Sequence, residues 1–176
     1  INTRTEREGV IASTNQNVSE SGTLNENRNN TSNTSGNSNE TTVGSENKNE
    51  IAWVKELFPE RKGYLDVYHH YGLTGAKSVF AHCVHLEEQE WDCMQQTNSA
   101  IAFCPTSNLF LGSGLFPLHT AWEKHVKVGL GSDVGAGTSF NQLQSLNEAY
   151  KVQQLQGNKL SAFEALYHAT LGGAKA

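Results

Sequence analysis

Three short apolar runs recur at regular spacing in the second half of the chain. They cover residues 78–84, 100–104 and 126–130, so their starts lie 22 and 26 residues apart. Helical patterns over residues 87–96 and 115–125 fill the two intervals. This alternation is typical of a parallel sheet with crossover helices. The spacing therefore predicts an α/β fold. Its sheet is either an open doubly wound sheet or part of a (β/α)8 barrel.

Further helices are predicted on both sides of this repeat. Residues 49–58 and 64–71 show helical spacing before it, and residues 141–155 form an amphipathic pattern after it. Ser161 and Glu164 have the spacing of a capping box, which predicts a last helix over residues 161–168. A barrel needs about 250 residues, so the segment after residue 44 would supply about half of one.

Composition divides the chain into two unequal parts. Residues 1–44 hold ten Asn and many Ser and Thr, whereas all 15 aromatic residues lie at or after Trp53 and all seven histidines at or after His69. A segment so poor in apolar side chains cannot bury enough surface to offset its ordering entropy. We therefore expect a disordered low-complexity segment at 1–44 and a folded domain at 45–176.

Charge and hydropathy exclude several classes of function. The net charge is −5, and no cluster of Lys and Arg predicts binding to nucleic acid. The sequence has neither an apolar run of 18 residues nor a signal peptide pattern, so we expect no membrane partner and a cytoplasmic location. The three cysteines form no C-x-x-C pair, which predicts reduced and mostly buried thiols. The first residue, Ile1, and the single methionine, Met94, suggest a piece of a longer protein.

Polar residues follow each predicted strand. His82 lies near the end of the first strand, residues 104–108 (CPTSN) follow the second, and Asp133 follows the third. Functional side chains gather at this edge of parallel sheets. Imidazole and carboxylate suit zinc, which would lower the pKa of a bound water to about 7. The pattern alone also fits a structural His82 and an Asp133 that only forms a turn.

The other histidines are predicted to have no role in the chemistry. His85 would point to the opposite face of the strand from His82 and is expected to be structural. The remaining histidines lie on predicted helices or their ends and are expected to face solvent: His69, His70, His119, His125 and His168. The glycine-rich residues 131–137 lack the spacing of a phosphate-binding loop.

Several motifs in order resemble one known family. They are SEN at residues 45–47, FAHC at 80–83, FCPTSN at 103–108 and GSD at 131–133. Together they resemble the guanine deaminase branch of the metal-dependent amidohydrolase superfamily. The resemblance covers residues 45–176, about three quarters of the chain.

This resemblance implies a fold, a reaction and roles for three residues. The fold would be the last three to four βα units of a TIM-type (β/α)8 barrel with one zinc ion. The reaction would be hydrolytic deamination of a small purine, guanine, to xanthine and ammonia. Asp133 matches the zinc ligand after the last barrel strand, His82 the histidine that assists the metal-bound water, and Glu46 the proton shuttle. A homodimer is common in such enzymes and is an expected partner.

The sequence departs from the family pattern at the other metal ligands. The family has a ligand histidine three residues before the position of Glu46, whereas this chain has Val43 there. The chain also lacks the H-x-H pair that supplies two more ligands in the family. Three of the four family ligands are therefore missing, and we expect little or no activity from this chain alone. Two alternatives stay open: a zinc aminohydrolase for another heterocycle, or a non-catalytic remnant that binds through its Asn- and Ser-rich tract.

Overall fold

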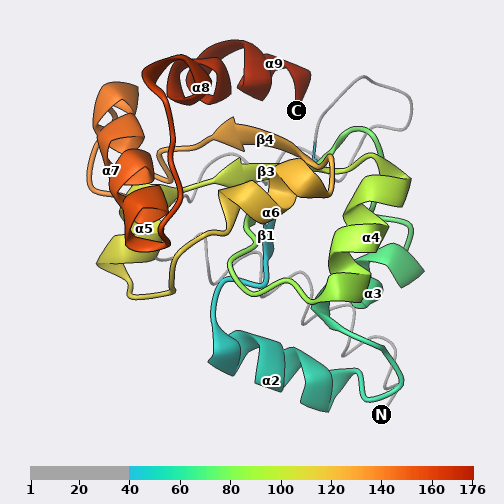
Figure 1. Cartoon of the computed structure of the whole chain (residues 1–176). Helices are drawn as coiled ribbons and strands as arrows, with labels where there is room; N and C mark the ends of the chain where they lie inside the picture. Colours follow the sequence, from blue (N-terminus) through green and yellow to red (C-terminus); the bar gives the residue numbers. More distant parts are fainter. Residues whose placement is uncertain (1–39) are drawn as a thin grey trace.

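The computed structural model describes residues 40–176, which form a four-stranded parallel sheet flanked by helices (Figure 1). The α/β class predicted from the spacing is thereby confirmed. The strands are β1 (Glu40–Gly44), β2 (Ser78–His82), β3 (Ala100–Phe103) and β4 (Lys127–Leu130). Their order in the sheet is β1-β2-β3-β4 and every pair is parallel. The described sheet thus lacks the reversal of strand order that characterises doubly wound folds.

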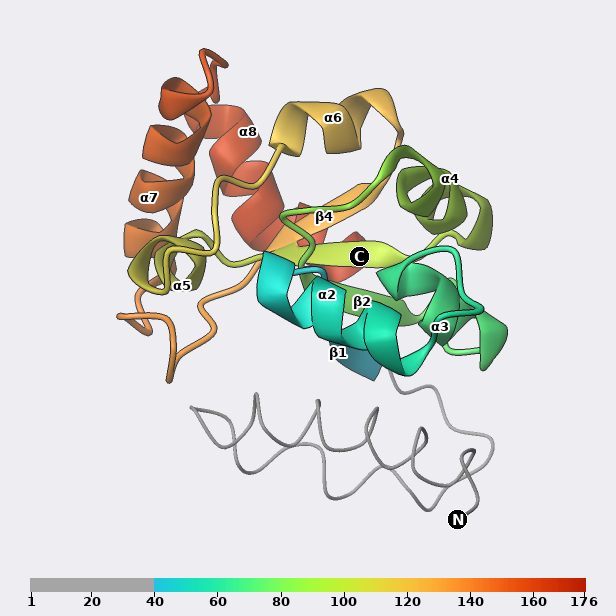
Figure 2. The ribbon, with the colours of Figure 1, turned by 90° about the horizontal axis from the view of Figure 1, so that it is seen from below.

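Helices surround the described sheet (Figures 1 and 2). In both views α7 lies on one side of the molecule and α3 with α4 on the opposite side (Figures 1 and 2). The helices are α2 (Lys48–Leu57), α3 (Tyr64–His70), α4 (Glu88–Thr97), α5 (Pro105–Phe110), α6 (Leu118–Glu123), α7 (Gln142–Leu155), α8 (Ala162–Tyr167), the π-helical η2 (His168–Gly172) and α9 (Gly173–Lys175). Within residues 40–176, no helix is long and apolar enough to cross a membrane.

Side-chain caps fix the ends of several helices. The Asn47 carboxamide oxygen accepts the backbone N–H of Glu50 at 2.9 Å, which starts α2 directly after β1. The capping box predicted for the last helix is confirmed, since Ser161 accepts from the Glu164 backbone and Glu164 accepts from the Ser161 backbone. A second box, between Glu87 and Glu90, starts α4.

The structure differs from the predicted elements in three places. Strand β1 was not predicted and lies inside the tract assigned to disorder, so regular structure begins five residues before Ser45, where it was expected. Residues 1–39 of that tract lie outside the described residues. Helix α5 was also missed. The helix predicted over residues 115–125 is shorter, because Pro117 is its N-cap and Phe116 packs into the core instead.

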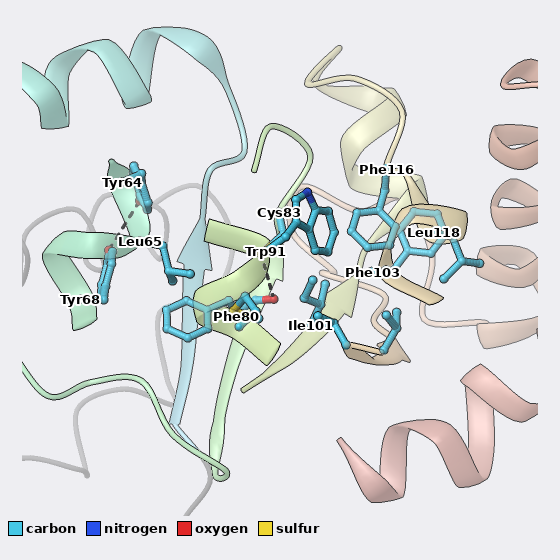
Figure 3. Packing of buried hydrophobic residues seen from close by; sticks show 14 of the residues in the cluster. Tyr64, Leu65, Tyr68, Phe80, Cys83, Trp91, Ile101, Phe103, Phe116 and Leu118 are labelled. Carbon is cyan, nitrogen blue, oxygen red and sulfur yellow. Dashed lines mark hydrogen bonds between the residues drawn. The ribbon is translucent and has the colours of Figure 1, made fainter. Parts of the chain in front are cut away.

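Large apolar side chains fill the space between the sheet and the helices (Figure 3). Phe80, Ile101 and Phe103 of the strands are almost completely buried, and the ring of Phe103 packs at a tilt against that of Phe116, with centroids 4.8 Å apart. Trp91 of α4 packs in the same cluster. Complete burial of such a side chain contributes about 1.5–3 kcal/mol. This cluster holds the strands in the register that brings their carboxyl ends to one edge.

Two predictions about single residue types have different outcomes. The cysteines are free, with Cys83 and Cys104 buried and Cys93 half-buried, as expected. His168 was predicted to face solvent, and this is wrong. Its Nδ1 donates to the Val128 carbonyl at 2.8 Å, and its Nε2 accepts from Trp122 Nε1 at 3.1 Å. It is buried because it satisfies two polar groups between β4 and α6.

Candidate active site

His82 ends strand β2 at the carboxyl edge of the sheet. Its side chain is buried, and its backbone is left-handed, with a φ of +68°. The Asn108 amide, on α5, donates to His82 Nδ1 at 3.0 Å. Because Nδ1 accepts this bond, the neutral ring carries its proton on Nε2. Asn108 therefore fixes both the tautomer and the orientation of the ring.

Two carboxylates lie on either side of this imidazole. Glu46, which follows β1, places Oε1 3.7 Å from His82 Nδ1, and Asp133, which follows β4, places Oδ2 3.8 Å from Nε2. The structure thus brings together the three residues singled out in the sequence, from three different strand ends. The register supports this geometry, since Gly44 pairs with His82 and Phe103 with Leu130.

The backbone at the candidate site is strained. Ser45, His82 and Asp133 have φ values of +43°, +68° and +46°, a region that side-chain-bearing residues rarely adopt. After Asp133 the turn is so tight that a Cβ at Gly137 would lie 1.9 Å from the Ser132 carbonyl oxygen. Strained residues persist only where the surrounding structure fixes them, and they cluster at functional sites.

Sequence reasoning missed two residues that hold these groups. Asn108 lies in the FCPTSN motif, which was singled out, but its contact with His82 was not predicted. Ser113 donates its hydroxyl to Glu46 Oε1 at 2.8 Å, across 67 residues of chain. No local pattern marks Ser113, because the contact depends on the tertiary fold.

A buried polar cluster lies behind Glu46. Glu50 accepts a hydrogen bond from the Tyr64 hydroxyl at 2.5 Å, and its second carboxyl oxygen has no partner among the described residues. Burial raises the pKa of Glu50, and the Tyr64 hydrogen bond partly offsets this. Burial also raises the pKa of the neighbouring Tyr68 to about 12. The charge of Glu46 adds to the cost of ionising Glu50, so the two carboxyl groups are coupled.

The described residues do not by themselves fit a zinc ion. His82 and Asp133 offer one imidazole and one carboxylate, whereas protein zinc sites use three or four ligands. Within residues 40–176 there is no group of three His, Cys, Asp or Glu side chains arranged to hold a metal. Cys104 does not supply a third donor, because its burial raises the pKa of the thiol and its Sγ faces the Ala102 carbonyl.

Comparison with known families identifies the scaffold. Residues 40–176 match the amidohydrolase family. Guanine deaminase from Escherichia coli K12 is 73% identical over 128 residues, and mouse guanine deaminase is 38% identical over 135 residues. Each alignment covers 73% of this chain. The chain spans only 29% of the first relative and 30% of the second.

Solved structures agree with this result. The structure of E. coli guanine deaminase superposes with a TM-score of 0.75 at 71% identity, covering 76% of this chain and 31% of that one. Guanine deaminase from C. acetobutylicum, solved with guanine bound in its active site, gives a TM-score of 0.74 at 35% identity. It covers 77% of this chain and 34% of that one.

Proposed function

The chain belongs to the amidohydrolase family, and we propose that residues 45–176 form the carboxyl-terminal part of a guanine deaminase barrel, the last three to four units of a (β/α)8 fold. The resemblance predicted from the sequence motifs is confirmed by the relatives and the solved structures. The parallel order of the strands along the chain supports the barrel, because neighbouring strands of a (β/α)8 barrel follow the chain in this way.

The proposed reaction of the complete protein is the hydrolysis of guanine to xanthine and ammonia. Water oxygen forms a bond to C2 of the purine, and the bond between C2 and the exocyclic nitrogen breaks. Glu46 would take a proton from the attacking water and give it to the neighbouring ring nitrogen. It would then move the remaining hydroxyl proton to the leaving amine, so that C2 becomes a carbonyl carbon. His82, with its proton on Nε2, would donate a hydrogen bond to the oxygen as charge develops on it.

One observation carries this proposal. His82 lies within 4 Å of both Glu46 and Asp133, at the sheet edge where the functional groups of such folds gather. An imidazole between two carboxylates can hold water and exchange protons with it. Packing alone does not explain the pairs His82–Glu46 and His82–Asp133, because apolar side chains of similar volume would fill a buried position without loss of stability.

Zinc is expected from the family, and Asp133 remains the predicted ligand of this chain. The described residues lack the further donors that a zinc site needs. The homodimer and the cytoplasmic location likewise stay predictions.

A hybrid enzyme tests the proposed function. Residues 45–176 would replace the matching segment of E. coli guanine deaminase, which is 73% identical over 128 residues. We expect the purified hybrid to convert guanine to equal amounts of xanthine and ammonia. A folded hybrid that makes no xanthine, beside an active parent, would contradict the proposal.

The same hybrid separates the two alternatives. A zinc aminohydrolase for another heterocycle would turn over a different substrate, such as adenine, cytosine or an aminotriazine, faster than guanine. The lack of metal donors among residues 40–176 favours a non-catalytic remnant. A remnant whose Glu46, His82 and Asp133 have lost their roles would leave the hybrid inactive on every substrate. Binding through residues 1–44 would then be the remaining hypothesis.

A further inference from the structure

We propose that Ser113 is a positioning residue for Glu46. Its hydroxyl would hold one carboxylate oxygen so that the other is turned toward the substrate for proton transfer. This inference rests on the proposed function of Glu46. It assigns a role in the site to the loop after α5, residues 111–114 (LGSG).

The contact between Ser113 and Glu46 is short and sheltered. Ser113 Oγ donates to Glu46 Oε1 at 2.8 Å, and the Glu46 side chain is largely buried. Hydrogen bonds to an ionised carboxylate are about twice as strong as those between neutral groups. The same Oε1 lies 3.7 Å from His82 Nδ1, so the bond fixes which oxygen faces the imidazole. A proton carrier must present one defined oxygen to its substrate.

The backbone of Ser113 is held at both ends. Its N–H donates to the Asn108 carbonyl at 2.9 Å, and its own carbonyl accepts from His85 Nε2 at 2.8 Å. Asn108 is also the residue that holds His82. The positions of Glu46 and His82 are therefore linked through Asn108 and Ser113. His85, for which a structural role was predicted, anchors this loop through its bond to the Ser113 carbonyl.

Two glycines allow the loop to approach so closely. Gly112 and Gly114 have φ values of +70° and +134°, and a Cβ on Gly114 would lie 2.8 Å from Val84 Cγ1. Residues with side chains are disfavoured at both positions. The two glycines thus let the loop bring Ser113 against Glu46.

The energetic test is a double-mutant cycle on the full chain. Ser113→Ala keeps the backbone bonds and removes only the hydroxyl. Urea unfolding would be measured for Ser113→Ala, Glu46→Ala and the double variant, with exposed Thr138→Ala as the control. We expect a coupling of about tenfold in the unfolding equilibrium constant for Ser113 with Glu46, and none for Thr138. If Ser113→Ala does not fold, Ser113→Cys, a weaker donor of similar size, takes its place.

The positional test is the NMR spectrum of the histidine rings. Ser113→Ala should shift the ring nitrogens of His82, because the freed Glu46 carboxylate changes their surroundings, and Ser113→Thr should restore them. A coupling below about twofold, or a coupling that leaves the His82 ring unmoved, would overturn the positioning role. Neither measurement needs turnover of guanine, so failure of the proposed function and failure of this inference remain distinguishable.

Discussion

Glu46 shows how individual residues build this site. Its carboxylate lies beside His82 and accepts the Ser113 hydroxyl, while Glu50 lies behind it at the start of α2. Each contact joins segments that are distant in the sequence or separated by a strained turn. The motif could predict which residue types meet at the sheet edge, but not which side chains hold them.

Glu50 should make the stability of the protein depend on pH. Burial raises the pKa of its carboxyl above the ordinary value of 4.5, so the folded state keeps a proton that the unfolded state loses. The resulting contribution to stability is complete below about pH 4.5 and is lost as the pH rises through the raised pKa. Glu50→Gln should therefore flatten the fall in the free energy of unfolding above pH 4.5, measured by urea titration across pH 4–8.

Exposed Glu56, on the same helix, provides the control for this titration. Glu56→Gln should leave the pH profile of the parent unchanged. A Glu50→Gln profile as steep as that of the parent would show that Glu50 does not retain its proton in the folded state.

Elements with a strong local pattern could be predicted from the sequence. Strands β2, β3 and β4 were found because buried apolar runs recur between helical patterns. Strand β1 was missed because its sequence, ETTVG, is polar and the strand depends on its pairing with β2. Helix α5 was missed because residues 104–108 were interpreted only as polar groups that follow a strand, whereas Pro105 is the first residue of the helix.

His168 connects three elements and should matter for stability. It joins η2 to the Val128 carbonyl of β4 and to the Trp122 indole of α6. His168→Phe would keep the bulk and leave both polar groups without this partner, at a cost of about 1–3 kcal/mol. Thermal and urea unfolding would measure this loss. His119→Phe, at an exposed position of α6, should change stability by less than about 0.5 kcal/mol. Equal effects of the two variants would contradict the role of His168.

At the scale of the molecule, the described strands form a parallel sheet in chain order, as the proposed partial barrel requires. β1 and β4 form its two edges, and unpaired strand edges invite association with other strands. The fold class could be predicted from spacing because parallel α/β folds repeat regularly along the chain. The full set of zinc ligands could not be predicted from this sequence, because a zinc site draws its ligands from several strands.

Position 43 should limit metal binding by this chain. It lies on β1, paired with Ala81, one residue before the pair Gly44–His82. Val43→His would restore the ligand histidine that the family has three residues before the position of Glu46, and we expect retained zinc to rise from well below one to about one ion per chain. Zinc would be measured by elemental analysis after dialysis. Gln144→His, at an exposed position of α7, should retain no additional zinc, and equal retention by both variants would contradict the prediction.

The turnover of guanine by the hybrid enzyme with Glu46→Gln tests the central claim most directly. The variant keeps the shape of the side chain and removes the group that carries the proton. We predict that kcat falls by at least about a hundredfold, whereas Glu56→Gln leaves kcat unchanged. A Glu46→Gln hybrid that forms xanthine as fast as the Glu56→Gln hybrid would contradict the assignment of Glu46 and the site built around it.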